Sequence, residues 1–353
     1  MNGGMGKRGK KPRRVRLEDI AAKVGVSLST VSRALSGEKG VREDVRQRIL
    51  DAARDANYAL PKPVAGTKVV LAASSAAMID YVRNQFTLYV LEGIRDRAEA
   101  VGIEIVTRPV ADAAEEQRVL EEARLDEEVA GLLFLTVDDE RMLAATRDVG
   151  KPVVLINGDD PLMRLSSVTP CNRSAAQLAT EYLIERGHER ILFLMRPGRR
   201  TIVRRLEGWR DALAQHGLPH PEDLVMSVDD WLPELADQVI SDRIGQRGLD
   251  FTAVLAAGES LAVGTMRALE RAGYGVPADV SVMGMDDLPQ AAFLSPPLTT
   301  VHIPAREIGM TGVDLLRDIC AGSPALPRRV ELACHIVERQ SVAGRRQDKA
   351  EDA

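Results

Sequence analysis

Residues 17–35 read LEDIAAKVGVSLSTVSRAL and decide how the first part of the chain folds. Apolar residues recur at helical spacing from Leu17 to Val24, which gives the first half of this stretch one apolar helical face. Gly25 follows at once, and glycine readily takes the left-handed conformation that closes a helix. Ser27 can then cap a second helix through its hydroxyl group. The stretch therefore predicts two short helices joined by a tight turn.

The second predicted helix has one apolar face and one face suited to reading DNA. Its inner face consists of apolar residues, namely Val31, Ala34 and Leu35. The residues left outside lie mostly near the helix start, and they are Leu28, Ser29, Ser32 and Arg33. A recognition helix presents its N-terminal side chains to base edges in the major groove, so this arrangement predicts a DNA-binding helix-turn-helix. The alternative is an ordinary helical hairpin with a solvated face.

This stretch and the residues after it resemble the DNA-binding headpiece of the lactose- and galactose-repressor family. The matching pieces are LEDIAAKVGVSLSTVSRALSG, a third helical run VREDVRQRILDAARDANY, and a proline soon after it. The resemblance implies that Leu28, Ser29 and Arg33 read bases, whereas Thr30 and Ser32 contact phosphates. An arginine can bind guanine at two points, and a leucine offers apolar contact such as a thymine methyl requires. The headpiece is expected to span residues 17–59.

The third helix is predicted at residues 41–57. Three apolar side chains should face inward and complete a three-helix core, namely Val45, Ile49 and Ala53. Its outer face carries either phosphate contacts or a merely solvated surface, with Arg42, Arg46 and Arg48. Residues 1–16 hold seven basic residues, among them Arg16, and no acidic residue. This flexible arm can follow the DNA backbone or enter the minor groove, or it can be a solubilising tail.

The charge is distributed unevenly along the 353 residues. Residues 1–62 hold 15 Lys/Arg against 7 Asp/Glu, whereas the whole chain has a net charge of −5. A basic headpiece on an acidic body fits attraction to phosphates at one end of the molecule only. The three cysteines, Cys171, Cys320 and Cys334, match no metal-binding pattern and suggest no disulfide framework. With no signal peptide and no membrane-spanning run visible, we expect a cytoplasmic protein without metal or cofactor.

Residues 60–68, reading LPKPVAGTK, are predicted to form a short extended linker. The family resemblance implies a hinge segment that becomes helical on the operator and wedges a leucine into the minor groove. Here the link is several residues shorter, and Pro61, Pro63 and Gly66 oppose a helix. Leu60 precedes these prolines and is not evidently the wedge. The operator spacing and the route from effector to DNA are therefore expected to differ from the family pattern.

From residue 69 onward, apolar runs alternate with amphipathic helices, which predicts parallel sheets covered on both faces. The strands are expected at residues 69–73, 103–107, 131–135, 153–156, 191–195, 253–256 and 280–285. Helices are expected, among others, at residues 86–100, 175–186, 206–216, 261–272 and 306–321. This number of elements is larger than one doubly wound sheet usually holds, and it therefore indicates two doubly wound lobes.

The resemblance extends through this body, which is similar to the periplasmic-binding-protein fold. It implies that the chain crosses between lobes near Thr169-Pro170, near His302-Ile303 and near residues 325–331. The expected fold is thus an all-α helix-turn-helix headpiece followed by a two-lobed α/β effector-binding and dimerisation domain at residues 69–340. The ranges for lobe 1 are about 69–169 and 303–327, and those for lobe 2 are about 170–302 and 328–340. Residues 341–353 are expected to form a disordered tail.

A small-molecule effector should lie between the lobes, at the carboxyl ends of the strands. By resemblance, Arg205 grips effector hydroxyl or carboxylate groups, because a guanidinium can bind two oxygens at once. The resemblance also implies that Asp286 accepts hydrogen bonds from effector hydroxyls and that Trp231 stacks on a ligand ring. The alternatives are a surface ion pair for Arg205 and a core position for Trp231. Three further residues are expected to line the cleft, namely Ser74, Phe86 and Asn157.

One expected cleft position departs from the family. Gly258-Glu259 stands where the family commonly has Asn-Asp, so an amide partner for the effector is missing and Glu259 takes its place. The effector is therefore expected to be larger, or differently oxidised, than a simple hexose. Five arginines follow the 191–195 strand, and those near the cleft favour an acidic sugar or a phosphate unless they form a basic surface loop: Arg196, Arg199, Arg200, Arg204 and Arg205.

Two other classes of protein share parts of this pattern. Gly258-Glu259-Ser260-Leu261-Ala262 resembles a degraded nucleophile elbow, with Asp286 and His302 following in the order of an α/β hydrolase. No oxyanion loop is evident, and Ser260 is explained adequately as a helix cap, so an enzyme is not expected. A transport-type binding protein shares the body fold but should lack the headpiece and carry a signal sequence.

The sequence therefore predicts a homodimeric, effector-responsive DNA-binding regulator, most simply a repressor. Its partners are double-stranded operator DNA of near-palindromic sequence and a sugar, sugar acid or related metabolite. The C-terminal residues RRQDKAEDA show no leucine heptad of the kind that joins dimers into tetramers.

Overall fold

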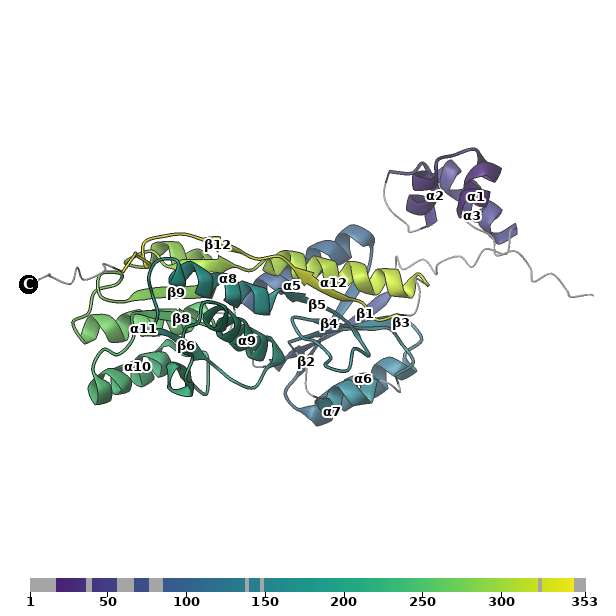
Figure 1. Cartoon of the computed structure of the whole chain (residues 1–353). Helices are drawn as coiled ribbons and strands as arrows, with labels where there is room; N and C mark the ends of the chain where they lie inside the picture. The colour runs from purple at the N-terminus through teal and green to yellow at the C-terminus, as the bar shows by residue number, and fades with distance from the viewer. Residues whose placement is uncertain are drawn as a thin grey trace, which may run out of the picture.

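The structure is a computed structural model that describes residues 17–35, 40–55, 67–75, 85–136, 140–146, 149–322 and 326–345. These residues form a small helical unit followed by two α/β lobes (Figure 1). The predictions for the arm at residues 1–16, for Arg16 and for most of the linker lie outside the described residues. Among the helices described, none is long and apolar enough to cross a membrane.

The helical unit is the predicted three-helix headpiece. It consists of α1 (Leu17–Val24), α2 (Leu28–Leu35) and α3 (Glu43–Asp55). Gly25 ends α1 with φ +75°, the left-handed conformation that glycine was expected to supply. The Ser27 hydroxyl accepts a hydrogen bond from the amide of Thr30 at 3.1 Å and so caps α2. The core holds the apolar residues Ile20, Val24, Val31, Ala34, Leu35, Ile49, Ala52 and Ala53.

Two arginines of α3 connect the helices to one another. Arg46 Nη1 donates to the carbonyl of Ala34 at 3.0 Å, and Arg48 Nη2 donates to the carbonyl of Val24 at 3.0 Å. Both carbonyls lie in the last turn of a helix, where they lack an intrahelical donor. Arg46 and Arg48 therefore have a structural role in the headpiece, and their phosphate contacts stay a prediction, as does that of Arg42, whose side chain is 82% exposed.

Lobe 1 is built on a six-stranded sheet in which all neighbouring strands are parallel, in the order β11-β5-β4-β3-β1-β2. Its strands are β1 (Lys68–Ser74), β2 (Glu104–Val110), β3 (Val129–Leu135), β4 (Val153–Ile156), β5 (Ser166–Pro170) and β11 (Arg329–Leu332). Helices α5 (Gln85–Val101) and α12 (Ala305–Cys320) pack on one face, and α6 (Ala113–Leu125) and α7 (Glu140–Ala145) pack on the other. Strand β1 contributes side chains to the apolar clusters on both faces of the sheet. Val69 and Leu71 belong to one cluster, and Val70 and Ala72 belong to the other.

Lobe 2 repeats this architecture with the strand order β12-β10-β9-β8-β6-β7. Its strands are β6 (Ile191–Met195), β7 (Val225–Ser227), β8 (Ala253–Ala256), β9 (Ser281–Asp286), β10 (Thr299–His302) and β12 (His335–Val337). The pairs are parallel except that β12 runs antiparallel to β10. Helices α8 (Asn172–Ile184) and α9 (Arg200–Gln215) cover one face, and α10 (Pro233–Arg247) and α11 (Glu259–Arg271) cover the other.

The helices α8 and α9 approach each other so closely that one position must be glycine. A Cβ atom placed on Gly208 would lie 2.0 Å from the carbonyl oxygen of Arg173. The neighbouring Trp209 is fully buried and contacts Phe193, with ring centroids 5.9 Å apart. The Gly208-Trp209 pair therefore fixes α9 against α8 and the sheet, and so fixes where the first turns of α9 lie.

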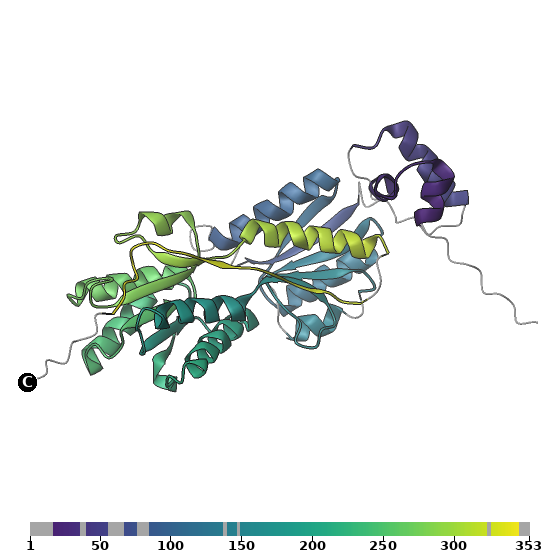
Figure 2. The same cartoon turned by 45° about the horizontal axis from the view of Figure 1, so that its top comes forward.

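The described chain crosses between the lobes after Pro170, after His302 and after Leu332. Figures 1 and 2 show the last crossing as one extended path that runs along both lobes through β11 and β12. The prediction placed this third crossing too early, at residues 325–331. Strand β11 pairs with β5, so residues 329–332 still belong to lobe 1.

The chain also stays ordered beyond the predicted start of its tail at residue 341. Ser341 is fully buried, and its hydroxyl accepts from the amide of Thr299 at 2.8 Å and donates to the carbonyl of Val282 at 2.6 Å. The amide of Arg345 donates to the carbonyl of Arg186 at 2.8 Å. The prediction of a disordered tail is therefore wrong for residues 341–345, which line the edge of lobe 2.

Candidate functional site

The outer face of α2 is the candidate DNA-reading surface. Leu28 is 45% exposed, and Ser29, Ser32 and Arg33 are also exposed. The core contacts of Val31, Ala34 and Leu35 hold this helix against α1 and α3, so the side chains predicted to read bases project from a packed element. A single exposed leucine is common on protein surfaces, so the exposure of Leu28 makes it available for contact but does not identify its partner.

Hydrogen bonds already organise the start of α2. The Ser27 hydroxyl lies 2.9 Å from the Ser29 hydroxyl and 2.7 Å from the Thr30 hydroxyl. Arg33 Nε donates to the carbonyl of Ser29 at 3.3 Å, which directs the arginine back along the helix toward its N-terminus. The side chains predicted to meet DNA thus gather at one end of α2.

Lobe 2 contains a buried charged cluster built around Arg205. The arginine is 6% exposed and projects from α9. Its Nε donates to Asn172 Oδ1 at 2.9 Å, its Nη1 donates to the carbonyl of Ala257 at 2.5 Å, and its Nη2 lies 3.8 Å from Asp286 Oδ1. Burial lowers the pKa of Arg205, and the carboxylate of Asp286 opposes that effect. The guanidinium is therefore held in one orientation before any ligand arrives.

Asp286 is the last residue of β9, and its side chain lies next to the first turn of α11. Its carboxylate accepts a hydrogen bond from the backbone amide of Glu259, so it caps a helix whose own N-cap residue, Gly258, offers no side chain. Burial raises the pKa of Asp286 to about 6, even though Arg205 acts in the opposite direction. Asp286 has φ +129°, a conformation that non-glycine residues rarely adopt and that is concentrated at functional sites.

The carboxylate of Glu259, which was expected to bind the effector, is engaged by groups of the chain itself. It accepts from the amides of Asp287 at 2.8 Å and Leu288 at 3.1 Å and from the hydroxyl of Thr300 at 2.9 Å. The residue is 2% exposed. Burial and then the charge of Asp286 raise its pKa to about 8. Glu259 therefore anchors the turn that follows Asp286.

Trp231 lies near Asp286, and its expected stacking on a ligand ring stays a prediction. A Cβ atom on Gly258 would lie 3.0 Å from the Trp231 ring and 3.8 Å from Asp286 Oδ2. The tryptophan is partly buried and packs against the apolar clusters on both faces of the lobe 2 sheet. Trp231, Arg205 and Asp286 thus come together in lobe 2, although they are up to 81 positions apart in the chain.

The three predicted residues of lobe 1 come from different elements. Ser74 ends β1, Phe86 lies in the first turn of α5, and Asn157 follows β4 with φ +53°. The carbonyl of Asn157 accepts a hydrogen bond from the Arg199 guanidinium, which comes from lobe 2. Residues 76–84, between Ser74 and Phe86, lie outside the described residues.

The other arginines after β6 interact with the chain itself. Arg200 Nε donates to Asp159 Oδ1 at 2.5 Å across the lobes, and Arg204 Nη1 donates to Glu207 Oε2 at 3.0 Å. Arg196 Nε donates to the carbonyl of Asp229 at 3.3 Å. With each of these guanidinium groups engaged, the number of arginines alone is no argument for an acidic effector.

The arrangement of a hydrolase is not formed among the described residues. His302 Nδ1 lies 2.9 Å from Asp287 Oδ2, and its ring faces His335 with centroids 4.8 Å apart. Ser260 lies inside α11 and has no hydrogen bond with His302 in the described structure. It is also not the helix cap that the sequence suggested, because α11 begins one residue earlier.

Asn172 is a site residue that the sequence did not reveal. It is 5% exposed at the first position of α8, where its Oδ1 accepts from Arg205 and its Nδ2 donates to the carbonyl of Pro170 at 3.2 Å. The residue follows a lobe crossing directly. It therefore connects Arg205 with a crossing between the lobes, a relation that only the folded chain shows.

Comparisons with known proteins agree with this architecture. A model of the bacterial regulatory proteins of the lacI family matches residues 16–60, and a model of a periplasmic binding protein-like domain matches residues 180–342. The HTH-type transcriptional regulator MalR of Streptomyces coelicolor is 31% identical over 347 residues, covering 93% of this chain and 96% of that protein.

Two solved structures are similar along nearly the whole chain. The complex of the transcriptional regulator CelR with cellobiose has a TM-score of 0.71 at 28% identity and covers 93% of this chain and 100% of its own. The lac repressor dimer bound to operator and the anti-inducer ONPF has a TM-score of 0.70 at 25% identity, with coverages of 94% and 100%. The chain therefore belongs to the lacI family of DNA-binding transcriptional regulators and not to a family of enzymes.

Proposed function

We propose that this regulator represses transcription as a homodimer bound to a near-palindromic operator, and that a small hydroxylated effector in the cleft between the lobes controls this binding. Two headpieces related by a two-fold axis place two α2 helices on equivalent half-sites, which is why the operator should be nearly palindromic. Leu28, Ser29 and Arg33 read bases, whereas Thr30 and Ser32 contact phosphates. Such a protein acts in the cytoplasm, where the chromosome lies.

The observation that carries the effector proposal is the meeting of Arg205, Asp286 and Trp231. Arg205 offers donors, Asp286 offers an acceptor, and the two charges largely cancel at 3.8 Å. A flat indole ring beside them suits the C–H face of a sugar. A neutral compound with several hydroxyl groups fits this combination, with Ser74, Phe86 and Asn157 closing the cleft from lobe 1. An effector can shift the balance between lobe arrangements only by its differential affinity for them.

A thermal-shift panel on the full chain tests the effector proposal, with neutral mono- and disaccharides, polyols, sugar acids and nucleosides as probes. A ligand at about 100 times its Kd adds about 2.7 kcal/mol and visibly raises the Tm. The shift should vanish in Asp286→Asn and Arg205→Lys. Arg243→Lys is the matched control, because Arg243 is 7% exposed in the same lobe and binds Asp250 away from the cleft. A shift unchanged in the first two variants would contradict the proposed site.

A further inference from the structure

Two successive arginines at the start of α9 reach from lobe 2 to one loop of lobe 1. Arg199 is the N-cap residue of α9, and its guanidinium donates to the carbonyl of Asn157. Arg200 Nε donates to Asp159 Oδ1 at 2.5 Å. Asn157 and Asp159 both belong to residues 157–165, which connect β4 with β5 and which we call the β4–β5 loop. One segment of lobe 2 therefore holds one segment of lobe 1 by two adjacent contacts.

The β4–β5 loop is held rigid by a carboxylate of its own. Asp160 has a fully buried side chain and accepts hydrogen bonds from Arg164 Nε and Nη2, both at 2.8 Å. It also accepts from the backbone amides of Leu162 at 3.1 Å and of Arg164 at 2.7 Å. Burial alone would raise the pKa of Asp160, but these donors hold it at about 2, so the carboxylate is ionised at neutral pH. The neighbouring Asp159 is thus presented to lobe 2 from a preorganised loop.

Asp159 has a second partner inside lobe 1. Its Oδ2 lies 3.3 Å from Arg329 Nη2 in β11, and the same nitrogen donates to the carbonyl of Asp160 at 3.0 Å. The side chain of Asp159 is only 9% exposed, so a carboxylate that lost every partner there would be strongly unfavourable. When Arg200 moves away, Arg329 keeps the carboxylate paired, and separating the lobes costs one partly exposed ion pair. The contact between the lobes can therefore open and close reversibly.

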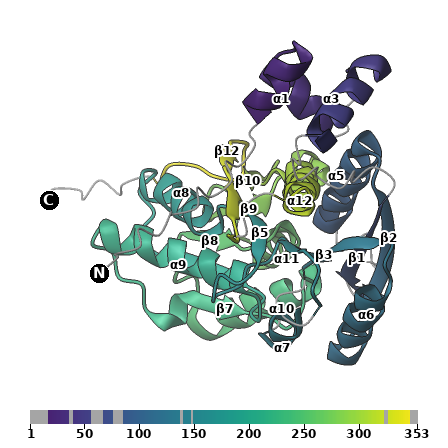
Figure 3. The ribbon, with the colours of Figure 1, turned by 90° about the vertical axis from the view of Figure 1, so that its right-hand side faces the viewer.

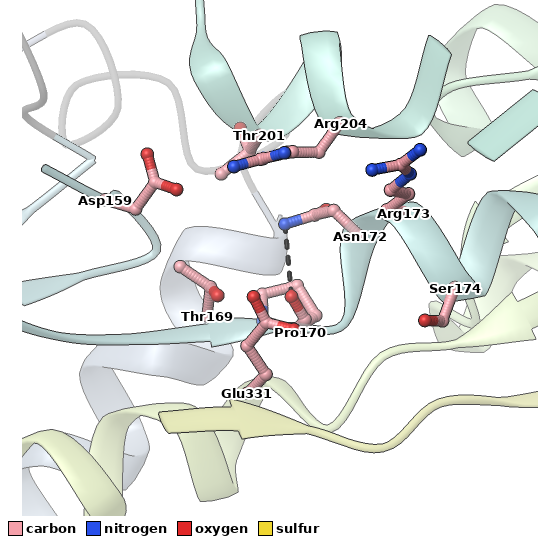
Figure 4. A pocket seen from close by; sticks show the side chains of 9 residues that line it. All are labelled: Asp159, Thr169, Pro170, Asn172, Arg173, Ser174, Thr201, Arg204 and Glu331. Atoms are coloured by element: carbon pink, nitrogen blue, oxygen red, sulfur yellow. Dashed lines mark hydrogen bonds between the residues drawn. The ribbon is translucent and has the colours of Figure 1, made fainter. Parts of the chain in front are cut away.

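A cavity of about 210 Å³ opens beside these contacts. Figure 4 shows Asp159 of lobe 1 and Thr201, which follows Arg200 in lobe 2, among the residues that line it. A cavity of this size means that the side chains of the two lobes do not pack closely at this point. The arrangement of the lobes therefore depends here on polar contacts rather than on apolar packing.

We propose that Arg199 and Arg200 form an interlobe latch with the β4–β5 loop, and that this latch holds the lobes of the ligand-free regulator in their present arrangement. The latch lies on the helix that carries Arg205, so an effector that moves lobe 1 relative to α9 acts either with the latch or against it. This consequence rests on the proposed effector control. The latch itself needs neither effector nor DNA, and its test uses neither.

Hydrogen–deuterium exchange of the full chain, followed by mass spectrometry, tests the latch. Arg200→Gln removes the ion pair between the lobes while it keeps a side chain of similar length. Amide exchange should then become at least about threefold faster in two segments at once, residues 157–165 of lobe 1 and residues 201–206 of lobe 2. A joint change in two lobes reports their separation, since local fraying of α9 would affect lobe 2 alone.

Two further variants separate lobe opening from local loosening. Arg329→Gln removes the other partner of Asp159 and should leave exchange in the segment of lobe 2 unchanged, because Arg200 still connects the lobes. Arg204→Gln is the matched control in the same helix, since its partner Glu207 lies in α9 itself at 3.0 Å. This control should leave exchange in the segment of lobe 1 unchanged.

Salt gives a second readout, which needs no substitution in the wild type. Raising KCl from about 0.1 M to about 1 M shortens the Debye length from about 10 Å to about 3 Å and so weakens partly exposed ion pairs. Exchange in both segments should therefore accelerate more in the wild type than in Arg200→Gln. Equal exchange in the wild type and Arg200→Gln, or a rise in both segments in Arg204→Gln, would overturn the proposal.

Discussion

The two functional regions of this regulator lie in opposite environments. The outer face of α2 is exposed and is fixed by three core residues beneath it, whereas Arg205 and Glu259 are buried in lobe 2 beside the partly buried Asp286. Figures 1 and 3 show the elements that carry these three residues, α9, β9 and α11, within lobe 2. Exposed side chains interact little with the rest of the fold, so changing them should affect recognition alone. Buried charges depend on one another, so changing one of them should affect stability and ligand binding together.

The largest expected effect is that of Arg205→Ala. Removing one partner leaves the carboxylate of Asp286 and the amide oxygen of Asn172 without their donor, and breaking a buried pair costs about 3–5 kcal/mol of unfolding free energy. Chemical denaturation of the full chain measures this, together with the loss of effector response. A variant as stable as the wild type would show that Arg205 is not a buried partner in solution.

The second prediction concerns Glu259 and pH. The folded chain holds the pKa of Glu259 at about 8 and that of Asp286 at about 6, above their ordinary values of 4.5 and 3.8. The unfolded chain therefore loses these protons first, and stability falls as the pH rises from about 4 to about 8. The stabilisation that protonated Glu259 and Asp286 provide is fully present only at pH values below their ordinary pKa values.

The Glu259→Gln variant isolates this effect. It keeps an acceptor for the turn after Asp286 but has no proton to lose, so the difference in stability from the wild type should change steadily between pH 5 and pH 8. Glu259→Ala instead removes every acceptor and should cost about 2–3 kcal/mol. If the unfolding free energies of Glu259→Gln and of the wild type changed with pH in the same way, Glu259 would be ionised throughout this range.

The difference between the two regions also explains which parts of the fold could be predicted from the sequence and which could not. Residues in and around α2 were predictable because helix periodicity, Gly25 and Ser27 act within a few positions. Strands β4, β6 and β8 were predictable as short apolar runs, whereas β5, reading SSVTP, is polar and becomes a strand only through its neighbours in the sheet. The half-exposed edge strands β11 and β12 likewise lack an apolar run.

The unpredicted parts of the sites depend on distant partners. Glu259 acts through residues 28 to 41 positions later, and Arg48 acts through a carbonyl 24 positions earlier. No local pattern encodes such pairs. The family resemblance supplied Arg205, Asp286 and Trp231 as candidates, but it could not supply Asn172 or the supporting role of Glu259, where this chain departs from the pattern.

The third prediction is that Arg33→Ala weakens specific operator binding by about 1–3 kcal/mol and relaxes sequence choice at one position of each half-site. Its unfolding free energy should stay within about 0.5 kcal/mol of the wild type, because the side chain is exposed. Fluorescence anisotropy with matched and single-substituted operators measures the first effect. Equal weakening on every sequence would make Arg33 a phosphate contact.

The smallest effect is expected for Arg42→Ala. This side chain is 82% exposed beside α3 and should contribute one phosphate contact per headpiece. The variant should bind all DNA sequences slightly less tightly and reduce the salt dependence by about one counterion per headpiece. Arg46→Ala is the contrasting variant, since it removes a hydrogen bond to Ala34 and should lower headpiece stability instead.

The most direct measurement is selection of bound sequences from random double-stranded DNA by the purified full chain, with Arg33→Ala selected in parallel. The account predicts a nearly palindromic consensus for the wild type, and for the variant the same symmetry with one position per half-site relaxed. An asymmetric consensus, or an identical one for both proteins, would contradict a two-fold dimer that reads bases through the exposed face of α2.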